Sequence, residues 1–221
     1  MKKTTKRILA LLLVLSMAIV VPVKVDAKTI KDYTSVAILY PKASPNNGEK
    51  QLVQYTKKVK AKNVKSSNKS VATVSVGKDS SSKEYAIYVV PKKKGTTTIT
   101  YKLGKDKHEL KVIVRKYVNP FKEVRVNGRN VTSQFNKSNV CYLSYKEYKN
   151  KKITLKFKKK GTWYLPHADY CTKSGKLISC IGSMDSPSKF KVTKKGSMAY
   201  FWVTDTMDKY EPAEDCMIIF K

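Results

Sequence analysis

Residues 98–103 read Thr-Ile-Thr-Tyr-Lys-Leu, and this stretch carries the pattern that decides the fold. Ile99, Tyr101 and Leu103 fall on one face of an extended chain and polar side chains fall on the other, because successive side chains of a β-strand point in opposite directions. Alternation of this kind is typical of a strand that is buried on one face only.

The same period of two recurs along the chain, and no stretch shows the 3.6-residue stripe of an amphipathic helix. In 110–114 the alternating residues are Leu, Val and Val, and in 152–158 they are Ile, Leu and Phe. Gly, Pro, Asn and Ser clusters separate the runs at short intervals, which predicts an all-β fold of antiparallel β-sandwiches. The other strand-like runs are 35–40, 51–59, 71–76, 85–90, 188–193, 198–205 and 215–220.

The turn residues agree with this fold. Val126-Asn127-Gly128-Arg129 predicts a tight hairpin, because a type I′ turn needs positive φ at both central residues. Lys-Lys-Gly recurs at 93–95, 159–161 and 194–196, each time before Thr or Ser. We expect these to be turns between strands with glycine in the left-handed region.

The N-terminus has the layout of a secretory signal peptide. Lys2, Lys3, Lys6 and Arg7 precede an apolar run at 8–21, and Val25-Asp26-Ala27 resembles a cleavage site. The run of 14 residues is shorter than the ~20 that a membrane-spanning helix needs. We therefore expect 1–27 to be removed and the rest to be secreted or extracellular, with no transmembrane segment in the mature chain. The alternative is an uncleaved N-terminal anchor.

The chain is strongly basic, with a formal net charge of +30. Removing 1–27 takes away five basic residues and one acidic residue, which leaves +26. Such a charge attracts polyanions, and outside a bacterium these include anionic cell-wall polymers and glycans. Arg115, Arg125 and Arg129 are the only arginines after residue 27, which disfavours specific nucleic-acid readout because that relies on bidentate arginine contacts. The alternative is a solvated lysine coat that keeps edge strands from pairing with other molecules.

Arg115–Pro120 has the character of a short linker. We therefore expect two domains, 30–117 and 118–221, with all four cysteines in the second. In the first domain 66–74 (Ser-Ser-Asn-Lys-Ser-Val-Ala-Thr-Val), 94–100 and 110–114 resemble the group 2 bacterial immunoglobulin-like (Ig-like) domain of invasin- and intimin-type surface proteins. The resemblance covers about 30–115. It implies that the Ser-Ser-Asn side chains close a turn onto the backbone and that Val71 and Val74 enter the core.

The second domain resembles Ig-like repeats of secreted Gram-positive proteins through 119–132 and 195–205. The two resemblances together predict tandem Ig-like β-sandwiches. They imply a structural or adhesive module, often a spacer, with no catalytic residues to carry over; fold alone does not fix function.

Four cysteines in an exported chain make disulfides plausible. If Gly175-Lys176 forms a two-residue type II′ turn, Cys171 faces Cys180 within disulfide reach. The remaining link would join Cys141 to Cys216. The alternative is four reduced cysteines.

We expect no catalytic residue, metal or cofactor. Cys171 and Cys180 lack the short spacing of zinc ligands, and His108 has the surroundings of a solvated hairpin tip. His167 and Asp169 lie near Cys171, but a catalytic triad is defined by geometry rather than by closeness in sequence.

The aromatic residues offer a second kind of binding. Trp163 and Tyr164 follow a glycine turn and are candidates for sugar stacking, although most aromatic residues of a lysine-rich sheet are expected in its core. The sequence thus predicts a non-enzymatic Ig-like surface protein for adhesion, spacing or binding to anionic wall polymer or glycan. A carbohydrate-binding accessory module is the first alternative, and an enzyme based on Cys171 and His167 is the second.

Overall fold

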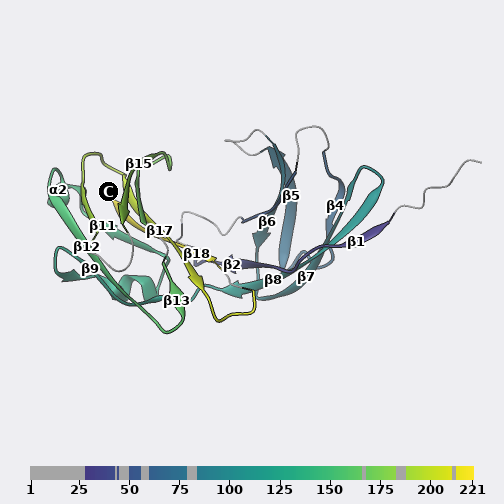
Figure 1. The fold of residues 1–221 in the computed structure, drawn as a ribbon, viewed down its shortest axis with the longest axis horizontal. Coiled ribbons are helices and arrows are strands. Elements are labelled where there is room, and N and C mark those ends of the chain that lie inside the picture. The colour runs from purple at the N-terminus through teal and green to yellow at the C-terminus, as the bar shows by residue number, and fades with distance from the viewer. Residues whose placement is uncertain are drawn as a thin grey trace, which may run out of the picture.

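The computed structural model describes residues 28–42, 44, 50–55, 60–78, 84–165, 168–182, 188–210 and 213–221. The expected signal peptide at 1–27 and His167 lie outside these residues. The described chain is almost entirely β-structure in four sheets, which form two sandwiches in tandem (Figure 1). The predicted all-β fold is therefore confirmed.

The first sandwich packs a five-stranded sheet against a three-stranded one. The larger sheet has the order β1-β8-β7-β4 with β2 also paired to β8, and the smaller has the order β3-β6-β5. The strands are β1 (Thr29–Lys31), β2 (Ser35–Leu39), β3 (Lys50–Tyr55), β4 (Lys62–Ser66), β5 (Ala72–Lys78), β6 (Tyr85–Pro91), β7 (Gly95–Leu103) and β8 (Asp106–Lys116).

The core of the first sandwich follows the predicted alternation. Ile99 and Tyr101 of β7 are buried and Leu103 packs against them. Leu110, Val112 and Val114 of β8 lie in the same cluster as Ile87 and Val89 of β6. Each sheet therefore contributes apolar side chains to one shared core.

The Ser-Ser-Asn segment closes a turn as expected. The Asn68 Oδ1 atom accepts hydrogen bonds from the Ser70 backbone N–H at 3.1 Å and the Ser70 hydroxyl at 2.7 Å. The Ser67 hydroxyl accepts from the Thr98 N–H at 2.9 Å. Val71 is buried directly after this turn and Val74 packs against the core.

The second sandwich packs a sheet of order β10-β9-β12-β16 against a sheet of order β11-β18-β17-β14-β15, with β13 also paired to β17. Two short helices, η1 (Thr132–Asn136) and α2 (Tyr145–Tyr148), interrupt the strands. The strands are β9 (Phe121–Val126), β10 (Arg129–Asn130), β11 (Val140–Leu143), β12 (Lys152–Lys159), β13 (Trp163–Tyr164), β14 (Ala168–Cys171), β15 (Leu177–Gly182), β16 (Ser188–Lys191), β17 (Met198–Asp205) and β18 (Ala213–Phe220).

Aromatic rings fill much of the second core. Phe121 lies 5.1 Å from Phe135 and 5.6 Å from Phe157 between ring centroids, and Phe157 lies 4.7 Å from Phe201. Edge-to-face and offset arrangements of this kind add to the hydrophobic stabilisation. Ile153 and Leu155 of β12 are buried and Phe157 packs against the core, as the alternation predicts.

Strand direction differs from the antiparallel prediction at three places. β1 and β2 both pair with β8 in parallel, and β11 pairs with β18 in parallel. Alternation of apolar and polar residues is the same in both directions, so the sequence pattern carries no information about strand direction. The one-turn helix α2 was also not predicted, because four residues are too few to show a helical period.

The Asn127-Gly128 turn has the predicted type I′ character. Both central residues have positive φ, at 49° and 83°, and Arg129 pairs directly with Val126. Gly161 and Gly196 of the Lys-Lys-Gly turns also lie in the left-handed region, at 45° and 80°. The same expectation is wrong for Gly95, which has a φ of 155° and begins strand β7.

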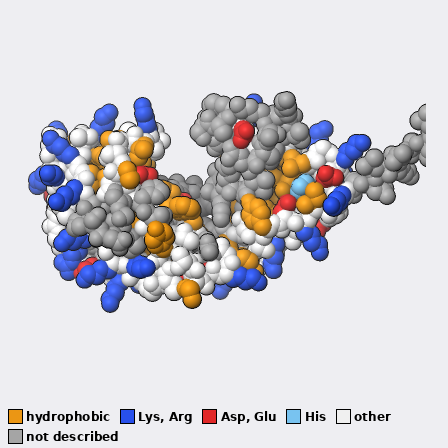
Figure 2. Space-filling model, viewed as in Figure 1, with side chains coloured by type: hydrophobic (Ala, Val, Ile, Leu, Met, Phe, Trp, Pro, Cys, Tyr) orange, Lys and Arg blue, Asp and Glu red, His pale blue; other side chains and the backbone are white. Residues whose placement is uncertain are grey.

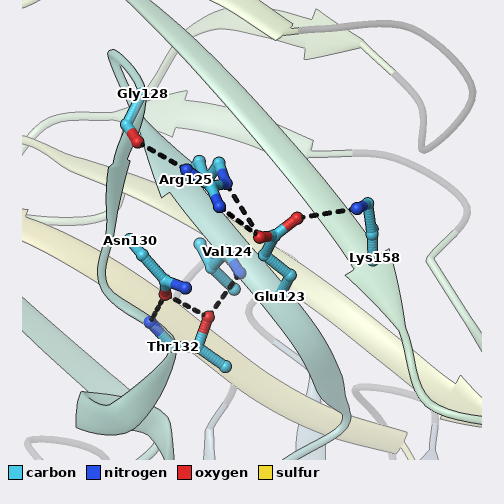
Figure 3. Close-up of polar contacts among 7 residues, drawn as sticks. All are labelled: Glu123, Val124, Arg125, Gly128, Asn130, Thr132 and Lys158. Atoms are coloured by element: carbon cyan, nitrogen blue, oxygen red, sulfur yellow. Dashed lines mark hydrogen bonds and ion pairs between the residues drawn. The ribbon is translucent and has the colours of Figure 1, made fainter.

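A small polar cluster fixes the hairpin of β9 and β10 (Figure 3). Arg125 donates to the Gly128 carbonyl at 3.0 Å and to Glu123 at 2.8 Å, and Lys158 of β12 pairs with Glu123 at 3.0 Å. Hydrogen bonds from Arg125 and Lys158 lower the pKa of Glu123 to about 2. We interpret this cluster as structural, because its charged groups satisfy one another.

The two sandwiches meet at a polar and aromatic junction. Tyr40 and Tyr117, which follow β2 and β8, have ring centroids 5.8 Å apart. The Tyr40 hydroxyl accepts a hydrogen bond from the Asp215 backbone N–H at 2.7 Å. Arg115 forms an ion pair with Asp208 across the same junction. Figure 1 shows that β18 (Ala213–Phe220) begins next to β2 at this place and runs away from it toward the C-terminus.

Glu214 is a buried carboxylic acid beside this junction. Its side chain is 2% exposed, its Oε1 accepts from the Val118 N–H at 3.4 Å, and its Oε2 has no hydrogen-bond partner. Burial raises the pKa of Glu214 to about 8; Asp215 and Asp205 act in the same direction, whereas the Val118 N–H opposes them. The group is therefore protonated in the folded protein near neutral pH.

We predict that the wild-type protein loses stability as pH rises from about 5 to about 8 and that the Glu214→Gln variant does not show this loss. The folded carboxyl keeps its proton up to a pKa of about 8, whereas the unfolded one ionises near 4.5, so stability falls as pH rises through this window. Glutamine cannot ionise, so the variant gains stability over the wild type as pH rises. Urea unfolding at several pH values measures the difference.

Glu123→Gln is the matched control. The depressed pKa of Glu123 contributes stability above about pH 4.5 that is lost toward pH 2. This variant should therefore be uniformly less stable than the wild type above pH 5, with no further trend. A Glu214→Gln difference that stays constant with pH would contradict a buried neutral acid.

Candidate functional site

The outer face of the sheet that contains β17 and β18 is largely apolar. On β17, Ala199, Phe201 and Val203 are buried in the core, so Met198, Tyr200 and Trp202 point away from it. The register places Ile219 of β18 opposite Met198 and Met217 opposite Tyr200. These residues cover the centre of the sheet on the side that faces away from the core.

A groove of about 750 Å³ lies on this face. We call it the outer-face groove. Its floor is made mainly by apolar side chains of β11, β17 and β18, and its rim is made by lysines from neighbouring turns and the last residue. The lining residues are Tyr142, Lys173, Lys195, Gly196, Met198, Met217, Ile219 and Lys221.

A smaller hollow of about 270 Å³ shares Met198 and Met217 with the outer-face groove. It extends toward β14 and β15, and Cys171 of β14, Leu177 of β15 and Tyr200 of β17 line it. The apolar surface is therefore wider than the groove itself. Asp169 also lines this hollow, whereas no acidic residue belongs to the described lining of the groove.

The turn at Gly196 and a cation–π contact help to place the rim lysines. Gly196 has a φ of +80°, and a Cβ atom on it would lie 3.2 Å from the Lys173 side chain. Glycine at 196 therefore allows the turn and leaves room for the Lys173 stem. Lys195 precedes Gly196, whose N–H donates to the Phe220 carbonyl at 2.6 Å. The Lys221 ammonium lies 3.7 Å from the centroid of the Tyr142 ring, as a cation–π contact.

The two aromatic residues singled out in the sequence face different directions. Trp163 is half-buried and packs against the second core, whereas Tyr164 is 50% exposed. Tyr164 pairs with Thr204 of β17. Thr204 and Trp202 are two residues apart, so they lie on the same face of β17. Trp202 is 46% exposed, so the accessible tryptophan is Trp202. Tyr164 and Trp202 lie on the face that also carries the outer-face groove.

The predicted register of the cysteines is wrong. Cys171 pairs with Leu177, and Cys180 pairs with Asp169, because irregularities shift the β14–β15 register. The loop is therefore longer than a two-residue turn, and Cys171 and Cys180 do not face each other. All four cysteines are free thiols in the structure, with Cys141, Cys171 and Cys216 buried and Cys180 exposed. The predicted links Cys171–Cys180 and Cys141–Cys216 are absent from it.

Two of the buried cysteines, Cys141 and Cys171, also lack the features of an activated nucleophile. Burial raises the pKa of Cys171, and the nearby Asp169 acts in the same direction. Burial raises the pKa of Cys141 to about 12. A reactive cysteine needs the opposite shift, because the thiolate is the nucleophile. No group of three or more His, Cys, Asp or Glu suited to a metal ion occurs among the residues that the structure describes.

His108 is not at a solvated tip as the sequence predicted. Its ring stacks on Tyr101 at 4.9 Å between centroids, and its Nδ1 lies 3.2 Å from Asp32 Oδ1. Tyr101 donates to Asp32 Oδ2 at 2.6 Å. These three residues connect the segment after β1 to β7 and β8. Sequence spacing could not show this, because Asp32 comes from the far end of the domain.

Comparison with known proteins assigns no family. No protein-family model matches the sequence, and no curated protein matches it. Similar solved structures include domains 5–6 of the S-layer protein SbsC, at 19% identity and a TM-score of 0.25 over 76% of this chain and 83% of that chain. The fibronectin(III)-like modules of Clostridium thermocellum CbhA have 12% identity and a TM-score of 0.26 over 90% of this chain and 92% of that chain.

The Yersinia pseudotuberculosis adhesin InvE has 11% identity and a TM-score of 0.19 over 80% of this chain and 51% of the adhesin. At such TM-scores these proteins give no argument about the function of this chain. The resemblance of 30–115 to the group 2 Ig-like domain stays a prediction. Among the described residues no helix is long and apolar enough to cross a membrane.

We predict that one thiol of the folded protein reacts quickly with a thiol-specific reagent and that denaturation exposes four. Cys180 is exposed, whereas the other three are buried. Cys180→Ser should abolish the fast reaction, and Cys171→Ser should leave it. Finding two or no free thiols in the denatured, unreduced protein would contradict the free-thiol state.

Proposed function

We propose that this chain is a non-enzymatic, surface-associated protein whose second sandwich binds an anionic wall polymer or glycan at the outer-face groove. The observation that carries the proposal is the set of rim lysines: Lys173, Lys195 and Lys221 all line one concave surface. The described lining holds no acidic side chain to neutralise them. An anionic chain lying in the groove meets all three charges at once.

The wider charge distribution supports the same partner. Lys and Arg side chains lie dispersed over both sandwiches on the face seen in Figure 2, and the chain carries a net charge of +30. A dispersed positive coat raises the local concentration of a polyanion without fixing its position. The groove then supplies the place where it is held. The hydrogen-bonded junction of the two sandwiches also suits a spacer at a cell surface.

We predict that replacing all three rim lysines with glutamine weakens polyanion binding about tenfold. Exposed charge pairs contribute about 0.2–1 kcal/mol each, and a total of about 1.4 kcal/mol corresponds to a tenfold change in affinity. The measurement is binding to an array of polyol-phosphate wall polymers, acidic glycans and neutral glycans at low and high salt.

The matched control replaces Lys92, Lys94 and Lys111 with glutamine. These lysines are exposed on the first sandwich, so the control loses the same charge. It should keep most of the affinity of the wild type. Equal losses in the two triple variants would place binding in the dispersed coat instead, and no binding by the wild type to any anionic member of the array would refute the proposed function.

Carbohydrate binding by aromatic residues is the second candidate. Exposed Tyr164 and Trp202 lie on neighbouring strands of one face, where a sugar ring can stack on them. Stacking survives high salt, whereas lysine-driven binding is screened. Retention on a neutral glycan at high salt that is lost in Trp202→Ala would favour this candidate.

A further inference from the structure

The floor of the outer-face groove has a chemistry that a hydrated polymer does not use. Met198, Met217 and Ile219 offer methyl, methylene and thioether groups and no hydrogen-bond donor. Methionine side chains adapt to irregular apolar ligands because they are flexible and polarisable. The floor therefore suits an aliphatic chain better than a row of hydroxyl groups.

Two other occupants fit the floor less well. The Lys221 ammonium already covers the Tyr142 ring at 3.7 Å, so a sugar can stack there only by displacing it. β17 and β18 are each hydrogen-bonded to neighbours on both sides. A peptide strand therefore cannot add to the sheet at the floor, because that mode needs a free edge.

We propose that the outer-face groove binds the alkyl chain of an anionic amphiphile, with the phosphate head group held by Lys173, Lys195 and Lys221. The positively charged lysines of the rim favour a negatively charged head group, and the apolar floor favours a ligand that has an alkyl chain. The volume of about 750 Å³ lies within the range of small-molecule sites. This inference rests on the proposed function, because it names the part of an anionic surface component that enters the same groove.

Dodecyl phosphate below its micelle concentration is the probe, and isothermal titration calorimetry of the full chain measures its binding. Inorganic phosphate supplies the head group without the chain, and dodecyl maltoside supplies the chain without the charge. We expect dodecyl phosphate to bind at least about tenfold more tightly than either, because chain and charge act together. Equal affinity for dodecyl phosphate and inorganic phosphate, or for dodecyl phosphate and dodecyl maltoside, would overturn the inference.

The double substitution Met198→Gln and Ile219→Thr makes the floor more polar while it keeps an unbranched side chain at 198 and a β-branched one at 219. The control double substitution Val118→Thr and Met207→Gln changes two exposed apolar residues elsewhere. Circular dichroism and thermal melting confirm the fold of each variant. We expect the floor variant to lose about tenfold in affinity for dodecyl phosphate and the control to match the wild type. Unchanged affinity in a folded floor variant would overturn the inference.

The array experiment on the same variants separates this inference from the proposed function. If polyol phosphate binds in a way that depends on the rim lysines but dodecyl phosphate does not bind, the inference of an amphiphile ligand is overturned. The proposed function is then unaffected. If the wild-type protein binds neither polyol phosphate nor dodecyl phosphate, both the proposed function and this inference are overturned. Binding of dodecyl phosphate that needs floor and rim together is the supporting result.

Discussion

The antiparallel ladder between β17 and β18 is the interaction on which the second sandwich depends. It runs in unbroken register from Met198 opposite Ile219 to Thr204 opposite Ala213. One face of the ladder gives the core its central residues, such as Phe201 and Cys216. The other face is the floor of the outer-face groove. A shift of the register by one residue would exchange the two faces and destroy both.

The same ladder also reaches the junction between the sandwiches. Glu214 and Asp215 of β18 contact Val118 and Tyr40 through hydrogen bonds. Core, groove and junction therefore all contain residues of β18.

Sequence patterns predicted the core better than the site. Alternation in 98–103, 110–114 and 152–158 identified buried residues, because one side of each strand must leave water. The groove had a weaker signal. Residues 198–203 and 216–220 contain no lysine and are apolar on both faces, which is typical of a strand covered on both sides. The rim could not be predicted, because Lys173, Lys195 and Lys221 come together only when β14, β17 and β18 are paired.

The sequence by itself determined the all-β class, the strands with one buried face and the type I′ turn at Asn127-Gly128, since each depends on side-chain alternation or on local backbone preference. Tertiary structure alone decided the direction of β1, β2 and β11, the separation of Cys171 from Cys180 and the placement of Asp32 beside His108. It also decided that three lysines line one apolar groove. The physical reason is the same in each case. These features depend on the register and order of strands that are distant in sequence. That register is set by the free energy of burying the whole core, and a local sequence pattern does not determine it.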